Sequence, residues 1–179
     1  YSSLRGAFAS ELASVTTFAG STDLYALLNT PTGLLAYSAI TGDLLTIAQP
    51  ANSIDFGSAV ALLHRSKSVR AYSPLRQTVA MLPVKPTASG AGNIVAFVTA
   101  INGQTHAFSS RTSTWVPAPA ACNGNPATIS TTTVALQSPT NCYAFAAGSG
   151  QFVALGHAVQ AIVSNPTSAP LLGYDANNL

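Results

Sequence analysis

The chain has 179 residues, a formal net charge of +2 and only 7% charged residues, whereas about 25% of the residues of an average soluble domain are charged. This length suits one domain with a sizeable core, the small net charge argues against nucleic-acid binding, and no run approaches the roughly 18 apolar residues of a membrane span. Because uncharged polar surfaces are common in secreted proteins, we expect a secreted protein whose leader has already been removed before Tyr1.

Short apolar runs separated by polar turns follow one another along the chain and predict β-strands. The N-terminal stretch contains helix-forming residues, but its agreement with a repeat described below favours strands over 4–10 and 12–18. Further strands are expected in sets of three, at 24–28, 34–39 and 43–49, at 60–63, 69–73 and 78–82, at 94–98, 105–109 and 114–116, and at 133–136, 142–146 and 151–155, with a last run at 171–174. An irregular fourth strand fits the longer connectors, around 53–56 and 159–163.

One pattern recurs five times: alanine, an aromatic residue, a small residue, and an apolar residue seven positions after the aromatic one. The copies are Ala7-Phe8-Ala9 with Val15, Ala36-Tyr37-Ser38 with Leu44, Ala71-Tyr72-Ser73 with Val79, Ala107-Phe108-Ser109 with Trp115, and Ala144-Phe145-Ala146 with Phe152. Because each aromatic residue recurs with an apolar partner, we expect these side chains in the core rather than in a sugar-stacking cage. The repeat length of about 35 to 39 residues is typical of a solenoid, a propeller or an array.

The last unit has only its first strand, and two strands are left over at the N-terminus. The chain therefore resembles an all-β, five-bladed β-propeller of three- to four-stranded blades, whose last blade is closed by strands from both termini. Its single domain divides into units near 23–58, 59–93, 94–132, 133–169, and 170–179 with 1–22. A closed ring gives each sheet two neighbours, and we place the first strand of each unit against the central channel. Tachylectin-type lectins and several five-bladed glycosidases share this architecture, although their blades are longer and their motifs are not found here.

The two cysteines, Cys122 and Cys142, lie 20 residues apart, and with the secreted-like composition they favour a disulfide over two free buried thiols. Neither has further ligands at a metal-binding spacing. The three histidines, His64, His106 and His157, occupy different positions of the repeat, so a symmetric metal ring is excluded. No phosphate-binding glycine loop and no Gly-x-Ser-x-Gly turn occurs, and we expect neither a metal nor a cofactor.

Candidate ligand-binding residues come from two observations. The position two before the repeated aromatic residue varies between copies, which indicates either a binding residue or an exposed site where any residue is tolerated. Basic residues also gather around 65–76, either as a solvated rim or as a site for an anionic ligand or partner. The candidates are Arg70, His106, Tyr143, Arg65 and Lys67.

The five carboxylates are expected in turns and connectors, so a pair facing each other across a glycosidic bond is not predicted. They are Glu11, Asp23, Asp43, Asp55 and Asp175. We therefore expect a secreted, non-catalytic, lectin-like binding module that binds carbohydrate through propeller loops. Its partners would be a glycan or a secreted or cell-surface protein, without nucleic acid. Two alternatives stay open: a structural or protein-interaction ring, and a small glycoside hydrolase.

Overall fold

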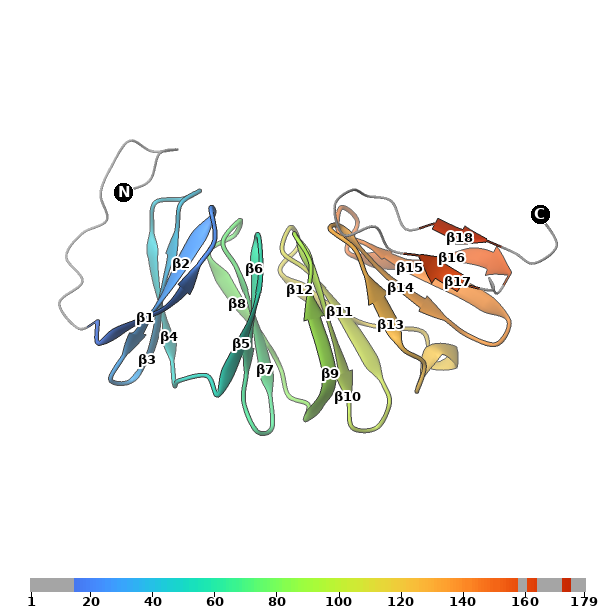
Figure 1. Cartoon of the computed structure of the whole chain (residues 1–179), viewed down its shortest axis with the longest axis horizontal. Coiled ribbons are helices and arrows are strands. Elements are labelled where there is room, and N and C mark those ends of the chain that lie inside the picture. The colour runs from blue at the N-terminus through green and yellow to red at the C-terminus, as the bar shows by residue number, and fades with distance from the viewer. Residues whose placement is uncertain (1–14, 158–160, 164–171, 175–179) are drawn as a thin grey trace.

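The computed structural model describes residues 15–157, 161–163 and 172–174, and this part of the chain is all-β (Figure 1). Four four-stranded antiparallel sheets follow one another, each with its strands in chain order. Sheet 1 contains β1 (Thr17–Ser21), β2 (Tyr25–Thr30), β3 (Gly33–Ser38) and β4 (Leu44–Ala48), and sheet 2 contains β5 (Ser53–Gly57), β6 (Val60–His64), β7 (Val69–Ser73) and β8 (Thr78–Leu82). Sheet 3 contains β9 (Pro86–Ala91), β10 (Val95–Ala100), β11 (Thr105–Ser109) and β12 (Thr114–Pro117), and sheet 4 contains β13 (Ala127–Ile129), β14 (Thr133–Gln137), β15 (Asn141–Ala146) and β16 (Gln151–His157).

The remaining described elements are small. A 3-10 turn, η1 (Ala120–Cys122), precedes β13, and β17 (Ala161–Val163) pairs with β18 (Leu172–Tyr174) in a two-stranded sheet. Within the described residues, no helix is long and apolar enough to cross a membrane.

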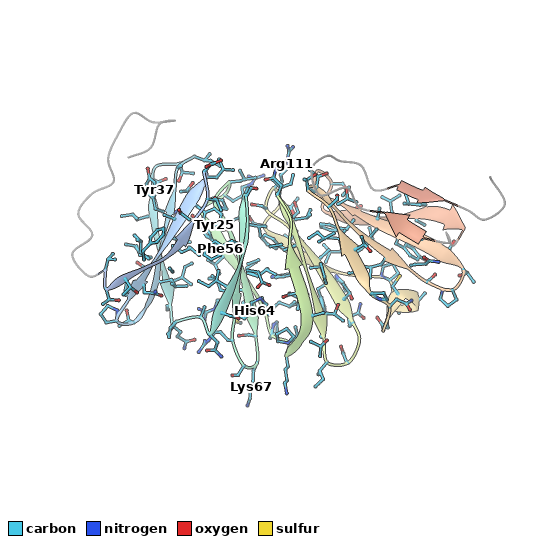
Figure 2. All side chains as sticks on the ribbon, in the orientation of Figure 1. Tyr25, Tyr37, Phe56, His64, Lys67 and Arg111 are labelled. Atoms are coloured by element: carbon cyan, nitrogen blue, oxygen red, sulfur yellow. The ribbon has the colours of Figure 1, made fainter. Side chains whose placement is uncertain are left out.

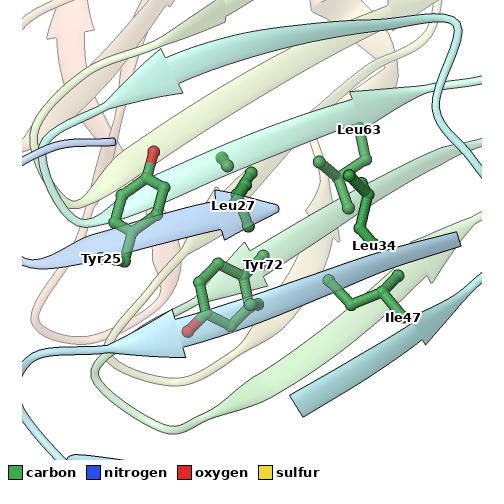
Figure 3. Close-up of a cluster of buried hydrophobic side chains, with 8 residues drawn as sticks. Tyr25, Leu27, Leu34, Ile47, Leu63 and Tyr72 are labelled. Atoms are coloured by element: carbon green, nitrogen blue, oxygen red, sulfur yellow. The ribbon is translucent and has the colours of Figure 1, made fainter. Parts of the chain in front are cut away.

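The repeated sequence pattern corresponds to a repeated cross-strand pair. In every sheet the aromatic residue of the third strand lies directly opposite the apolar residue seven positions later, as in Tyr72 with Val79 and Phe108 with Trp115. The sheets pack face to face, and Tyr72, Phe108 and Phe145 are fully buried against the sheet that precedes their own. Figure 3 shows the cluster between sheets 1 and 2, where Tyr72 meets Tyr25 and their ring centroids lie 5.6 Å apart. The predicted core role of these three aromatic residues is confirmed.

The small residue of the pattern joins one sheet to the next. The hydroxyl of Ser38 donates to the carbonyl oxygen of Pro74 at 2.8 Å, Ser73 donates to that of Ser110 at 2.7 Å, and Ser109 donates to that of Ala147 at 2.7 Å. All three serines are fully buried, and buried hydroxyls of this kind hold neighbouring sheets in one register. We call these three contacts the serine links.

The extra strand that we expected after a set of three belongs to the following sheet, which it opens. The segment around 53–56 was expected to close the first unit, yet β5 pairs with β6 and opens sheet 2, and β1, β9 and β13 take the same place in their sheets. Only two residues connect β5 to β6, so these strands form a tight hairpin. The strand that we placed against the channel, such as β6, therefore lies inside its sheet. The unit boundaries shift accordingly.

Four four-stranded sheets are described where five blades were predicted. They stand side by side in chain order, with sheet 1 at one end of the row and sheet 4 at the other, in a propeller-like repeat (Figure 1). The strand predicted over 4–10, the first three residues of the one predicted over 12–18, and the closing of the last blade lie outside the described residues. Residues 17 and 18 of that second strand belong to β1, which opens sheet 1.

The predicted disulfide is wrong, because Cys122 and Cys142 are both free thiols and both are buried. Cys122 packs with Ala118 and Leu136 in an apolar cluster, where it fills the place of a small apolar side chain. Burial raises the pKa of both thiols, and the nearby Cys142 raises that of Cys122 further. Spacing and composition alone did not distinguish two neighbouring thiols from a bonded pair.

Candidate functional site

Three of the five candidate residues occupy the same place in successive sheets and therefore lie apart. Arg70 is on β7, His106 on β11 and Tyr143 on β15. Burial lowers the pKa of the half-buried His106, which favours the neutral ring. Tyr143 packs against the cluster around Cys122. The structure thus gives His106 and Tyr143 no common site, and their variation within the repeat reflects separate local environments.

Arg65 and Arg70, in contrast, are brought together by a residue of sheet 1. Gln49 follows β4, and its side-chain oxygen Oε1 accepts hydrogen bonds from Nη1 of Arg65 and from Nη2 of Arg70, the latter at 3.2 Å. Nη1 of Arg70 also donates to the carbonyl oxygen of Ala48. One neutral oxygen therefore lies between two guanidinium groups. We call Arg65 and Arg70 the arginine pair.

Gln49 adopts a backbone conformation that is uncommon for its residue type. Its φ is 71°, in the left-handed region where a residue with a Cβ costs of order 1 kcal/mol. Its backbone N–H donates to the carbonyl oxygen of Thr32 at 2.8 Å, which fixes the connector in this conformation. Sequence reasoning missed Gln49, because neither its φ nor its distance to sheet 2 leaves a local signal.

Further cations lie at the same end of the sheets. Lys67 is in the turn between β6 and β7, and Lys85 is in the connector after β8. Because Val69 pairs with Leu82, that connector starts beside the β6–β7 turn. We call this surface, formed by Arg65, Lys67, Arg70 and Lys85, the basic end. Figure 2 shows Lys67 at this end and Arg111 at the opposite one.

No carboxylate neutralises the basic end within the described residues. The single ion pair in this part of the chain joins His64 Nε2 to Asp55 Oδ2 at 2.9 Å. A hollow of about 450 Å³ adjoins Arg70 between β4 and β8, and its other lining includes Leu45, Ile47 and Gln77. The basic end thus combines unneutralised positive charge with space for a small ligand.

A second polar cluster joins sheets 2 and 3 beside a hollow of about 220 Å³. Asp55 Oδ2 accepts from the Ser89 hydroxyl at 2.6 Å and contacts His64 Nε2 at 2.9 Å, while Ser89 Oγ lies 3.4 Å from the same Nε2. A serine hydrolase needs the carboxylate on one ring nitrogen and the serine on the other. Here the carboxylate and the serine hydroxyl both face Nε2, and the serine donates to the carboxylate. The cluster therefore joins two sheets and does not have the geometry of a catalytic triad.

Sequence reasoning also missed this cluster, because the strand expected around 53–56, which contains Asp55, was assigned to the first unit, whereas β5 pairs with β6. The signal was present: across the tight β5–β6 hairpin, Asp55 pairs with Leu62, so His64 is its diagonal neighbour on the same face. Within the described residues, no group of three histidine, cysteine, aspartate or glutamate side chains gathers as metal ligands do.

No protein-family model matches the chain, and no curated protein matches it either. Among solved structures, the chain is similar to the computationally designed Ika8 protein, with a TM-score of 0.40, 12% identity, and coverage of 84% of this chain and 52% of that one. It is similar to the N-terminal domain of Nup159, with a TM-score of 0.41, 11% identity, and coverage of 89% and 46%. For apo AztD from Citrobacter koseri the TM-score is 0.38, the identity 12%, and the coverage 81% and 48%. The chain spans about half of each, and likeness of this degree transfers no function to it.

Proposed function

We propose that the chain is a non-catalytic, lectin-like binding module that recognises anionic glycans at its basic end. The observation that carries the proposal is the arginine pair, in which two guanidinium groups share one neutral acceptor. Two like charges held close together without a counter-charge repel each other. A carboxylate or sulfate group relieves that repulsion, and it accepts the paired N–H donors of a guanidinium group in a bidentate geometry.

The surroundings of the arginine pair favour a glycan over a longer polyanion. Four cations form the basic end, whereas nucleic acid is bound by a dense basic stripe. The adjoining hollow of about 450 Å³ is lined by apolar residues and by threonines beside Arg70, which suits a sugar ring carrying one acidic group. The proposal includes secretion, because an extracellular module meets acidic glycans.

We also propose that the ring closes with a fifth blade built from both termini. Tyr72, Phe108 and Phe145 each pack on the preceding sheet, and Tyr37 occupies the same place in sheet 1, so a further sheet would give it the same environment. Spin labels at Ser10 and Asn177 would test this by electron double resonance. Strands of one sheet lie about 4.8 Å apart, and a closed blade predicts a short, narrow distance distribution. A broad distribution at long distances would contradict closure.

The binding proposal is tested by calorimetry with a sulfated disaccharide as the probe, at low and at physiological salt. We expect salt-sensitive binding that weakens at least tenfold, or about 1.4 kcal/mol, in Arg70→Ala. Arg111→Ala, which removes a cation at the opposite end, is the matched control and should bind like the parent chain. Gln49→Glu is the sharpest variant: it places a carboxylate between the two guanidinium groups, so it should stabilise the fold while abolishing binding.

Three results would count against this function. The probe could fail to bind the parent chain, Gln49→Glu could bind as the parent chain does, or Arg111→Ala could lose as much affinity as Arg70→Ala. The last outcome would show that binding depends on net charge alone.

A further inference from the structure

A third hollow lies at the end of the sheets opposite the basic end. It has a volume of about 380 Å³, and three successive sheets contribute to it through the turns β5–β6, β9–β10 and β13–β14. Its lining includes Phe56, Ser58, Asn93 and Thr131. Among the described residues, none that lines this hollow is charged. We call it the turn hollow.

The frame of the turn hollow is tightly held. The backbone N–H of Ala59 donates to the carbonyl oxygen of Asn93 at 2.6 Å, and that of Asn93 donates to the carbonyl oxygen of Thr131 at 2.8 Å. The turns also approach closely at Gly57, where an added Cβ would lie 2.0 Å from the carbonyl oxygen of Gly92. The three turns therefore form one rigid rim.

Phe56 supplies an aromatic platform in this rim. Its ring stacks on that of Tyr25, with centroids 6.2 Å apart and an interplanar angle of 8°, and Figure 2 shows the two residues as neighbours. Tyr25 is itself fixed, because its hydroxyl lies 2.9 Å from the carbonyl oxygens of both Gly57 and Val60. Phe56 nevertheless keeps 38% of its surface exposed. An exposed aromatic ring is therefore held in one orientation beside the hollow.

Three neutral polar side chains accompany the platform, one from each turn. Within the described residues, the hydroxyls of Ser58 and Thr131 and the side-chain amide of Asn93 have no hydrogen-bond partner, although their backbone carbonyl oxygens are all occupied. Together they offer two hydroxyls and one amide around an apolar face. These groups remain available to a ligand.

We propose that the turn hollow is a binding site for a neutral saccharide ring, separate from the basic end. A pyranose has one apolar face of C–H groups, which packs on an aromatic ring, and equatorial hydroxyls that both donate and accept. An ionised ligand would find no counter-charge among the described residues of this lining. A purely apolar ligand would leave the amide of Asn93 desolvated and unpaired, which costs free energy. This site does not depend on the proposed recognition of anionic glycans.

Saturation-transfer NMR with methyl glycosides of glucose, galactose and N-acetylglucosamine tests the site, and calorimetry follows with the best probe. We expect transfer to the ring protons of at least one probe, and at least a tenfold loss of affinity in Phe56→Leu, which keeps apolar volume and removes the flat face. Asn93→Ala should also weaken binding. Phe18→Ala is the matched control, because Phe18 is an exposed phenylalanine (63%) on β1 outside the lining of the hollow, and it should bind like the parent chain.

Circular dichroism and Trp115 fluorescence establish that each variant is folded. The proposal is overturned if none of the three probes receives saturation, if Phe56→Leu and Phe18→Ala lose affinity equally, or if Arg70→Ala abolishes binding of the neutral probe while Phe56→Leu does not. The last result would assign neutral sugars to the basic end. Failure of the sulfated probe alone would overturn the proposed function and leave this site standing.

Discussion

Removing one serine link tests how the sheets are held together. Ser73 is fully buried, donates to the carbonyl oxygen of Ser110 at 2.7 Å, and accepts from the Ser110 hydroxyl at 2.7 Å and from the backbone N–H of Arg76 at 3.3 Å. In Ser73→Ala, the Ser110 carbonyl oxygen, the Ser110 hydroxyl and the backbone N–H of Arg76 each lose this partner. Ser110 is itself fully buried. Each buried polar group left unpaired costs about 1–3 kcal/mol.

We expect Ser73→Ala to lower the free energy of unfolding by about 3 kcal/mol, because the Ser110 carbonyl and hydroxyl stay buried without a partner. For a chain of this size the loss corresponds to a fall in Tm of roughly 6–12 °C. Urea unfolding measures it directly, and Trp115, the single tryptophan, packs in the cluster between sheets 2 and 3, so its fluorescence reports on the affected interface. The midpoint should fall while the slope with urea stays constant.

Ser66→Ala provides the control, because Ser66 is exposed in the β6–β7 turn. Its effect should remain within about 0.5 kcal/mol. If Ser73→Ala is equally mild, buried hydroxyls do not hold the sheets together, and the apolar clusters alone explain their packing. A change in the urea slope would instead show that the variant unfolds in separate parts.

Three further predictions concern other parts of the fold. Gly57→Ala should destabilise the chain by about 3 kcal/mol, because its Cβ would lie 2.0 Å from a backbone oxygen. Gly148→Ala, whose Cβ would meet no atom of the described residues within 4 Å, should be nearly neutral in the same urea assay. Burial raises the pKa of Tyr25 and Tyr72. Above pH 10 the unfolded chain therefore binds fewer protons than the folded chain, and the free energy of unfolding should fall as pH rises. Alkaline unfolding should move to higher pH in Tyr25→Phe. Both cysteines should react with a thiol reagent in denaturant, and slowly in the folded chain because they are buried thiols with raised pKa.

The parts of the fold that follow from local chemistry could be read from the sequence. The bounds of β7, β8 and β11 agree with the prediction, because alternating apolar residues between turn-forming residues determine strands of this kind. The opening strands of sheets 3 and 4, β9 and β13, could not be assigned in this way. β9 begins with Pro86 and contains mostly small residues, so its β-structure comes from pairing with β10 and not from its own propensity.

The candidate site likewise has parts that local sequence predicts and parts that only the packing of sheets brings together. Arg65 and Arg70 were singled out because one hairpin carries both, and a hairpin keeps near neighbours together. Gln49, which joins them, comes from the neighbouring sheet, and only the packing of sheet 1 on sheet 2 brings its side chain there. His106 and Tyr143 were chosen by the same repeat argument as Arg70, yet a repeat position recurs once per sheet and so separates its members in space.

Both proposed sites depend on contacts between sheets, but on different ones. The arginine pair bridges sheets 1 and 2, whose serine link is Ser38. The turn hollow spans sheets 2, 3 and 4, and Ser73 links the first two of these. In sheet 4 the equivalent residue is the exposed Ala146, which has no hydroxyl to donate onward. Loosening the link at Ser73 should therefore weaken the neutral-sugar site more than the anion site, and equal weakening of both would mean that the sheets respond to strain as one body.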